Sequence, residues 1–402
     1  MKRRHSLLGA LVAVLLSVPA AHAGQPALAP TLTSALRAPG VSLGRTAAIA
    51  VDTSTGEILY AHNATRPVPP ASNEKLPVAW AALERLGAGY RFSTVVRGDG
   101  ERRGTTWRGN LVLVGRGDPT LTARDLEVMA ATIAARGIRI VTGGILGDES
   151  AFDRRRDAPG WKHSFVGIET PPLSALVVDR AAGWPKHSPP LLAAKTLRSA
   201  LQRRGVVVRG TAGVGRIHAE ATVLATDWSV PLAEIVGAMN RDSDNFVAEM
   251  LLKHLGTTEG AQGTTAGGAA IVLAEMRAAG IPTKGVRIVD GSGLSRLDRL
   301  TASALVGVIR AGLANPEIRT PFLASLAVAG SSGTLRDRLP ALRGVVLGKT
   351  GTTSLACTLT GLVRGAIAFA VLQNGAPVSY WAARTAQDRF VLALAERTSA
   401  VP

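Results

Sequence analysis

Three short clusters of hydroxyl, amide and amine side chains occur along the chain, at Ser72-Asn73-Glu74-Lys75, Ser243-Asp244-Asn245 and Lys349-Thr350-Gly351. A serine with its own lysine, a second serine beside an amide, and a second lysine are the parts of a serine acyl-transfer site. The chain has only eight lysines, and two of them fall in these clusters. From the composition, the ordered set should arise in about one random chain per thousand or fewer. Each cluster alone is weak evidence, whereas the set predicts nucleophilic catalysis.

The first cluster can make a nucleophile with its own base. Helical spacing over 71–86 places Ser72 and Lys75 one turn apart on one face, so the amine can reach the hydroxyl. A lysine at its usual pKa of about 10.4 is protonated, so burial or a second cation must lower that pKa. Repulsion by Lys349 is expected to favour neutral Lys75, while Lys349 keeps its charge for the substrate. Read alone, the cluster also fits a simple helix N-cap at Ser72, because serine before a helical run with a lysine downstream is common.

The second and third clusters supply a proton path and a binding edge. Ser243 can relay a proton to a leaving amine, Asn245 can donate its amide to Lys75 or to the substrate backbone, and Asp244 should point away. Lys349-Thr350-Gly351 ends an apolar run, so it should lie at a strand edge where an extended peptide can bind. In isolation, these clusters are more simply a helix-capping loop and an ordinary strand end.

Composition argues against several other classes of function. A formal net charge of +17 indicates a polyanionic neighbourhood, such as cell-wall polymer or lipid headgroups. Aromatic residues make up only 4% and the arginines are scattered, so we expect no nucleic-acid partner. No histidine–cysteine cluster predicts a metal, and no cofactor is expected. Cys357, the only cysteine, lies in an apolar run and should be a buried strand residue, not a catalytic thiol.

The first 23 residues predict export. Lys2, Arg3 and Arg4 precede an apolar run over 7–18 and a small-x-small site at 21–23. This run is shorter than the ~20 residues that span a bilayer, which favours a cleaved signal peptide over an uncleaved membrane anchor. We therefore expect a periplasmic or extracellular protein associated with the cell wall.

The remaining chain predicts two domains of α/β (α+β) class. Residues 24–92 and 228–402 should form one domain, in which an N-terminal hairpin and three C-terminal strands make a five-stranded antiparallel sheet flanked by helices. Residues 93–227 alternate strands and helices and predict an inserted accessory α/β domain. Helices are expected over 71–86, 121–136, 190–204, 232–239, 244–254, 269–279 and 302–313, with a last one ending near 397. Strands are expected over 46–51, 57–61, 109–115, 138–146, 206–208, 344–350, 355–363 and 366–373.

Longer strings around these clusters resemble the D-alanyl-D-alanine carboxypeptidase/endopeptidase family of penicillin-binding proteins, the class C low-molecular-mass type of peptidase family S13. The strings are Pro70–Lys75, Gly117–Leu121, Pro159–Trp161, Asp290–Arg296 and Gly348–Thr352. The resemblance covers nearly the whole mature chain and implies a penicillin-binding/serine β-lactamase-like transpeptidase fold. It also implies hydrolysis of the D-Ala-D-Ala bond in peptidoglycan stem peptides, a second D,D-endopeptidase activity, and acylation by β-lactam antibiotics.

The resemblance assigns a role to each site residue. The implied catalytic residues are Ser72 as the acylated nucleophile, Lys75 as the general base, Ser243 as the proton relay and Asn245 as the orienting amide. The implied substrate-binding residues are Lys349 and Thr350 for the terminal carboxylate, Gly351 and Thr352 along the strand, and Arg296 and Asp148 for the peptide side chain. The backbone N–H groups of Ser72 and Thr352 would form the oxyanion hole.

Two alternatives remain open from the sequence. A serine β-lactamase uses the same clusters, but its first two lie closer together than Ser72 and Ser243, and it needs a placed carboxylate. Glu74 and Glu249 lie near the clusters, although charged helix residues usually face solvent. The second alternative is a non-catalytic wall-binding scaffold. A damaged cluster would favour it, and none of the three clusters is damaged. The chain is also shorter than expected for the family between Val178-Asp179-Arg180 and Ser243, which predicts a reduced accessory region.

Overall fold

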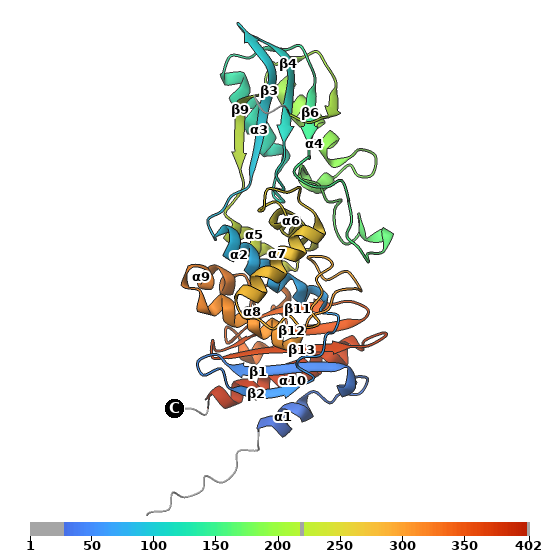
Figure 1. The fold of residues 1–402 in the computed structure, drawn as a ribbon, viewed down its shortest axis with the longest axis vertical. Coiled ribbons are helices and arrows are strands. Elements are labelled where there is room, and N and C mark those ends of the chain that lie inside the picture. Colours follow the sequence, from blue (N-terminus) through green and yellow to red (C-terminus); the bar gives the residue numbers. More distant parts are fainter. Residues whose placement is uncertain (1–27, 218–220, 400–402) are drawn as a thin grey trace, which may run out of the picture.

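An antiparallel sheet forms the base of the larger domain (Figure 1). The computed structural model describes residues 28–217 and 221–399, so the predicted signal peptide lies outside the described residues. The sheet has the order β10-β11-β12-β13-β1-β2. Its strands are β1 (Thr46–Asp52), β2 (Ile58–His62), β10 (Ala327–Val328), β11 (Val346–Thr352), β12 (Ala356–Val363) and β13 (Ile367–Asn374). Five are the expected strands, and the two-residue β10 adds a sixth at one edge.

Alternate residues of the central strands enter two different cores. In β1, Ile49 faces the helical layer of the domain, whereas Ala50 faces the opposite core. That second core is closed by α1 (Leu28–Ala35) and α10 (Tyr380–Ser399), which lie together beneath the sheet in Figure 1. Because successive side chains of a strand point to opposite faces, a sheet covered on both faces needs apolar residues at successive positions. This explains the almost continuous burial of β12 and β13.

A layer of helices separates this sheet from the inserted domain (Figure 1). The helices are α2 (Lys75–Leu86), α5 (Leu232–Asp242), α6 (Asn245–Leu255), α7 (Thr265–Ala278), α8 (Ala302–Ala314) and α9 (Pro316–Ala324). Helix α2 contacts the five others and is buried over its first nine residues. The helix predicted over 71–86 begins as a 3-10 turn, Ala71–Glu74, and Ser72 lies in that turn.

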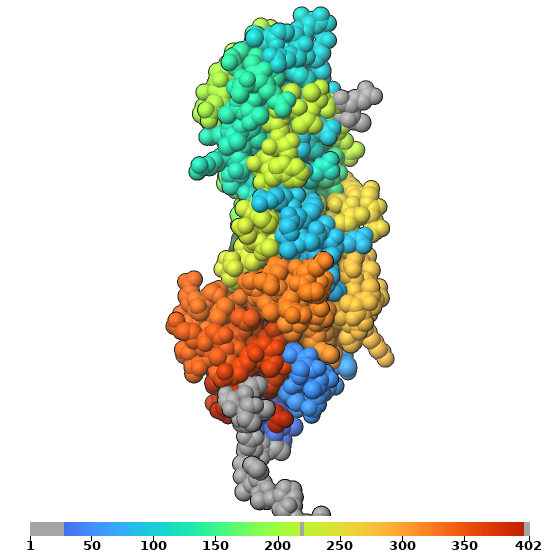
Figure 2. All heavy atoms as spheres, turned by 90° about the vertical axis from the view of Figure 1, so that its left-hand side faces the viewer, coloured from blue at the N-terminus to red at the C-terminus, as the bar shows by residue number. Residues whose placement is uncertain are grey.

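Residues 93–228 supply the whole second sheet, at the far end of an elongated molecule (Figures 1 and 2). Its strands are β3 (Ser93–Arg103), β4 (Thr106–Val114), β5 (Ile140–Val141), β6 (Ile145–Asp148), β7 (Val207–Val208), β8 (Ala212–Val214) and β9 (Thr222–Trp228). Strands β4, β3 and β9 are antiparallel, and the remaining pairings are parallel. Helices α3 (Ala123–Ala135) and α4 (Pro189–Arg203) share one apolar core with it.

Several elements differ from the sequence expectation. The strand predicted over 138–146 is two strands, because the chain changes partner at Gly143-Gly144 and pairs with β7 before them and β8 after them. Gly144 allows this crossing, since a Cβ there would lie 2.2 Å from the Thr211 carbonyl oxygen. Strand β3 was not expected, because its second half, 99–103, is charged and exposed in a hairpin with β4.

Candidate active site

The three clusters meet at one point of the larger domain. Lys75 Nζ lies 3.0 Å from Ser72 Oγ and 2.8 Å from Asn245 Oδ1. Lys349 Nζ lies 2.8 Å from Ser243 Oγ. The first cluster lies on the turn before α2, the second at the junction of α5 and α6, and the third on β11. Folding therefore brings together five predicted side chains separated by up to 277 positions in the sequence.

The backbone around Ser72 is held in an unusual conformation. Ala71 has a φ of 48°, a left-handed value that costs energy in a residue with a Cβ. Two glycines press against this turn: a Cβ on Gly293 would lie 1.8 Å from the Ala71 carbonyl oxygen, and one on Gly351 would lie 2.8 Å from the Ser72 nitrogen. The glycine of the third cluster thus lets β11 approach the backbone of Ser72.

Asn73 joins the first cluster to the sheet, a role that the sequence analysis missed. Its side-chain amide donates to the Lys349 carbonyl oxygen at 2.9 Å, and its oxygen accepts from Thr360 Oγ1 at 2.7 Å. Both contacts are buried, where an amide needs its hydrogen bonds satisfied. Asn73 therefore fixes the distance between the Ser72 turn and the strand that carries Lys349.

The second cluster forms the corner between two helices. Ser243 ends α5 with a φ of 60°, and the Asp244 side chain caps α6 by accepting from the Val247 N–H at 3.1 Å. Asp244 also forms an ion pair with Arg180, so it points away from Lys75 as expected. The helix-capping interpretation is therefore correct for Asp244, while its two neighbours face the lysines. The Asn245 amide was expected to donate to Lys75, but it donates to the Glu169 carbonyl oxygen at 3.0 Å, which orients the side chain so that its Oδ1 accepts from Lys75.

Burial is the main cause of the perturbed lysine pKa values. Both amines are fully buried, and burial lowers the pKa of Lys75 to about 8. The negative charge of Asp290, followed by that of Glu249 when it is ionised, opposes this shift. Repulsion between the lysines was expected to lower the pKa of Lys75, but it lowers the pKa of Lys349 instead. Burial, and to a smaller extent the charge of Lys75, lowers the pKa of Lys349 well below its usual value. An incoming carboxylate would restore the charged form of Lys349, since an opposite charge favours ionisation.

A loop at 290–296 completes the surroundings of Lys75. The Ser292 carbonyl oxygen accepts from Lys75 Nζ at 2.8 Å. Asp290 shapes the loop by accepting from the N–H groups of Gly293 and Ser295, each at 2.7 Å, and from Trp161 Nε1 at 2.7 Å. The string that carried the family resemblance here is therefore a structural turn that supplies a backbone acceptor to the site.

Glu74 and Glu249 do not face solvent, contrary to the expectation for charged helix residues. Both side chains are completely buried, and burial is the largest cause that raises the pKa of each. Glu249 Oε1 accepts from the N–H groups of Gly291 and Ser292. It is therefore engaged with backbone and does not supply the placed carboxylate that a lactamase would need.

A cleft of about 230 Å³ opens beside Ser72. Its lining includes Ala71, Thr352, Arg296, Lys162 and Phe165. Arg296 and Thr352 are thus in reach of a bound peptide. Asp148 is not: it is buried at the end of β6, where it accepts from the Ser150 and Ile217 N–H groups, and it lines a separate cavity. The structure does not bring Asp148 to the cleft.

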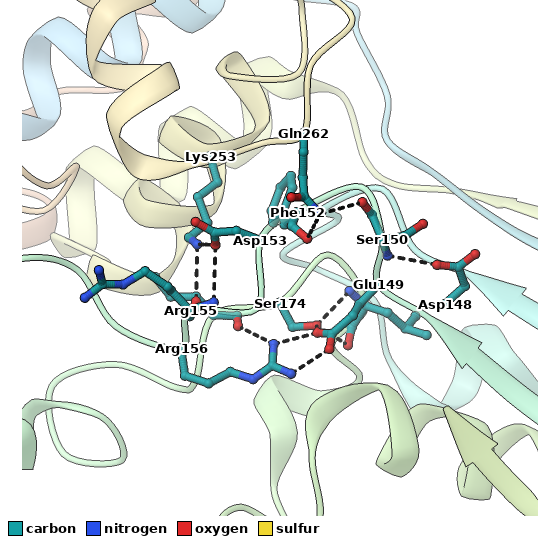
Figure 3. A network of polar contacts seen from close by, with 12 residues as sticks. Asp148, Glu149, Ser150, Phe152, Asp153, Arg155, Arg156, Ser174, Lys253 and Gln262 are labelled. Atoms are coloured by element: carbon teal, nitrogen blue, oxygen red, sulfur yellow. Dashed lines mark hydrogen bonds and ion pairs between the residues drawn. The ribbon is translucent and has the colours of Figure 1, made fainter. Parts of the chain in front are cut away.

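The inserted domain is tied to α6 and to the segment that follows this helix by polar contacts (Figure 3). Lys253, fully buried on α6, forms an ion pair with Asp153 and donates to the Arg155 carbonyl oxygen at 3.2 Å. Gln262 donates to the carbonyl oxygens of Ser150 and Phe152 at 3.1 and 2.9 Å. The segment held here continues to Lys162, Phe165 and Glu169 at the cleft. The inserted domain therefore forms one wall of the cleft beside Ser72.

A double-mutant cycle tests this anchor. Lys253→Met is expected to lower the free energy of unfolding by about 3 kcal/mol, because it leaves the Asp153 carboxylate partly buried without its partner. Asp153→Asn should also be destabilising, and the double variant should lose less than the sum of the two single variants. Urea unfolding of all four proteins measures the coupling. Strict additivity would show that the ion pair does not hold the domains together.

Three observations concern the described residues only. Within 28–217 and 221–399, no group of three or more histidine, cysteine, aspartate or glutamate residues could hold a metal ion. In the same ranges, no helix combines the length and apolar character needed to cross a membrane. Cys357 is buried on β12, as predicted for a strand residue, and burial raises the pKa of its thiol.

Sequence comparisons identify relatives over most of the chain. A model of the D-Ala-D-Ala carboxypeptidase 3 (S13) family matches residues 28–186 and 181–397. The chain is 33% identical to the D-alanyl-D-alanine carboxypeptidase of Actinomadura sp. (strain R39), over 87% of this chain and 80% of that protein. It is 31% identical to carboxypeptidase DacB of Mycolicibacterium smegmatis, over the same two shares. The two segments matched by the family model meet at 181–186, next to the place where the chain was expected to be short.

Solved structures show the same fold. Penicillin-binding protein 4 (dacB) of Haemophilus influenzae superposes with a TM-score of 0.80 at 21% identity, over 92% of this chain and 98% of that one. A predatory endopeptidase of Bdellovibrio bacteriovorus, acylated by penicillin G, has a TM-score of 0.52 at 18% identity, over 88% and 89% of the chains. At these low sequence identities, the solved structures show only that the fold is shared. The family model and the curated relatives show which family the chain belongs to. The chain belongs to the D-Ala-D-Ala carboxypeptidase 3 (S13) family.

Proposed function

We propose that this protein is an exported serine D-Ala-D-Ala carboxypeptidase that acts on peptidoglycan stem peptides through an acyl-enzyme on Ser72. The observation that carries the proposal is the contact between Ser72 and a fully buried Lys75, beside the pair of Ser243 and Lys349. The names of the curated relatives support the substrate class. Cleavage of D,D cross-bridges is proposed as a second activity, supported by the endopeptidases that share the fold.

The first half of the reaction forms the acyl-enzyme. Neutral Lys75 takes the proton of the Ser72 hydroxyl, and Oγ attacks the carbonyl carbon of the penultimate D-alanine. The backbone N–H groups of Ser72 and Thr352 stabilise the resulting oxyanion. As the tetrahedral intermediate collapses, the C–N bond breaks. The proton that Lys75 took from Ser72 passes through the Ser243 hydroxyl to the leaving amine of the terminal D-alanine, which leaves Lys75 neutral again.

The second half releases the shortened peptide. A water molecule gives its proton to Lys75 and attacks the ester carbonyl carbon, after which Ser72 regains its proton. Lys349 and Thr350 bind the carboxylate of the terminal D-alanine in the first half, and the cleft beside Thr352 and Arg296 takes the rest of the peptide. A β-lactam would acylate Ser72 by the same attack, with no amine free to leave.

Two assays on the purified protein test this proposal. Incubation with a stem peptide ending in D-Ala-D-Ala should release D-alanine, and incubation with labelled penicillin should give a long-lived adduct. Rapid turnover of the penicillin without D-alanine release would identify a β-lactamase instead. Absence of both an adduct and D-alanine would identify a non-catalytic wall-binding protein. Mass analysis of digested muropeptides would then measure the balance of carboxypeptidase and endopeptidase action.

A further inference from the structure

One face of α6 connects three parts of the protein to the active site. Asn245, Glu249 and Lys253 follow one another at intervals of four residues, so their side chains lie on the same face of the helix. Asn245 contacts Lys75, and Lys253 holds the inserted domain (Figure 3). Glu249 lies between them and has no part in the reaction described above.

Glu249 binds the backbone segment whose carbonyl oxygen accepts a hydrogen bond from Lys75. Its Oε1 accepts from the N–H groups of Gly291 and Ser292 at 2.9 and 2.8 Å, and the carbonyl oxygen of Ser292 accepts from Lys75 Nζ at 2.8 Å. The loop is pressed against α6 here, since a Cβ on Gly291 would lie 2.6 Å from the Ala248 carbonyl oxygen. One carboxyl oxygen thus fixes two successive amides, and the second of those residues positions the amine.

The surroundings of Glu249 favour its neutral form. The ionisable groups around it are Asp290, Glu74 and Lys75, and burial followed by the charge of Asp290 raises the pKa of Glu249 to about 8. A protonated carboxyl still accepts two hydrogen bonds at Oε1. It adds no negative charge beside Lys75, and such a charge would raise the pKa of that amine and disfavour the free base. Glu249 Oε2 is buried without a hydrogen-bond partner, where a charge would be most costly.

We propose that Glu249 is a positioning residue for the reaction: its Oε1 clamps the backbone of Gly291 and Ser292 and thereby holds the Ser292 carbonyl oxygen against Lys75 Nζ. The inference depends on the assignment of Lys75 as the general base. With Asn245 Oδ1 and Ser292 O as two fixed acceptors, Lys75 keeps its amine directed at Ser72 Oγ in either charge state.

Three substitutions separate this role from a general effect on stability. Glu249→Gln keeps an oxygen that can accept both N–H groups and mimics the neutral acid. Glu249→Leu keeps much of the volume but leaves both N–H groups unpaired. Met250→Leu, at the next buried position of α6, is the matched control. Acylation of the full chain by labelled penicillin is followed from pH 6 to 10, well below each variant's melting temperature.

The glutamine variant should acylate within about threefold of the wild type. The leucine variant should lose about tenfold to a hundredfold at every pH, because an amine displaced by about 1 Å loses that much rate. Should it fail to fold, Glu249→Asp, whose shorter carboxyl falls short of the loop, is expected to show the same loss. The control should match the wild type.

Two results would overturn the inference: a leucine or aspartate variant as fast as the wild type, or a glutamine variant as slow as the leucine one. The second result would mean that the charge of Glu249, and not its clamp, matters. Failure of the proposed function looks different, because the wild type itself would then form no adduct on Ser72.

Discussion

Ser72→Ala is expected to abolish both the penicillin adduct and the release of D-alanine, with a fall of about 10⁴-fold or more in the rate. The substitution removes the atom that forms the acyl bond, and no other residue places a hydroxyl within 3.0 Å of Lys75 Nζ among the contacts of this amine. Intact-mass measurement after penicillin treatment and chromatography of released D-alanine measure the loss.

The same variant should remain folded. The Ser72 hydroxyl contacts only Lys75 among its described side-chain partners, so its removal leaves the surrounding turn in place. The melting temperature should stay within a few degrees of the wild type, as for the control Ser331→Ala at an exposed serine. A folded alanine variant that still released D-alanine would show that Ser72 is not the nucleophile.

Lys75→Ala is expected to slow acylation by about 10²–10⁴-fold, the usual contribution of a general base. The pH profile carries the more specific signature. Because burial lowers the pKa of Lys75 to about 8, the neutral amine becomes more abundant as the pH rises toward 8. Wild-type acylation should therefore rise about tenfold per pH unit below that value and level off above it, and the variant should lose this rise.

Stopped-flow acylation from pH 6 to 10 measures both profiles, with Lys349→Ala as the matched comparison. That variant should mainly raise the KM for a peptide with a free terminal carboxylate, because Lys349 binds this group. Two results would contradict this division of roles. One is a wild-type profile that does not rise as the pH approaches 8, and the other is the same decrease in kcat and the same increase in KM in both lysine variants.

The central side chains could be predicted from the sequence because their chemistry and their local elements agree. Ser72 and Lys75 are three residues apart at a helix start, and Lys349 lies at the end of an apolar run, so the direction of each side chain follows from a local pattern. The three clusters in this order are typical of a serine acyl-transfer site, so the order predicted that they would meet in one site. The central strands and most helices were also predictable, since apolar periodicity marks them.

The rest of the site could not be predicted because it consists of backbone groups and buried charges. The carbonyl oxygens of Ser292 and Glu169 bind Lys75 and Asn245, yet a carbonyl oxygen has no sequence signature. The burial of Glu249 depends on the loop that covers it, which a helical pattern does not reveal. Burial or a second cation was expected to lower the pKa of Lys75; burial is the largest cause, and the repulsion between the lysines lowers the pKa of Lys349 instead.

Mapping the residue acylated by penicillin tests the central claim most directly. The account predicts that digestion of the wild-type adduct gives one labelled peptide, that the label lies on Ser72, and that its formation follows the neutral fraction of an amine titrating near pH 8. A label on any other residue, Ser243 included, would contradict the assignment of nucleophile and base.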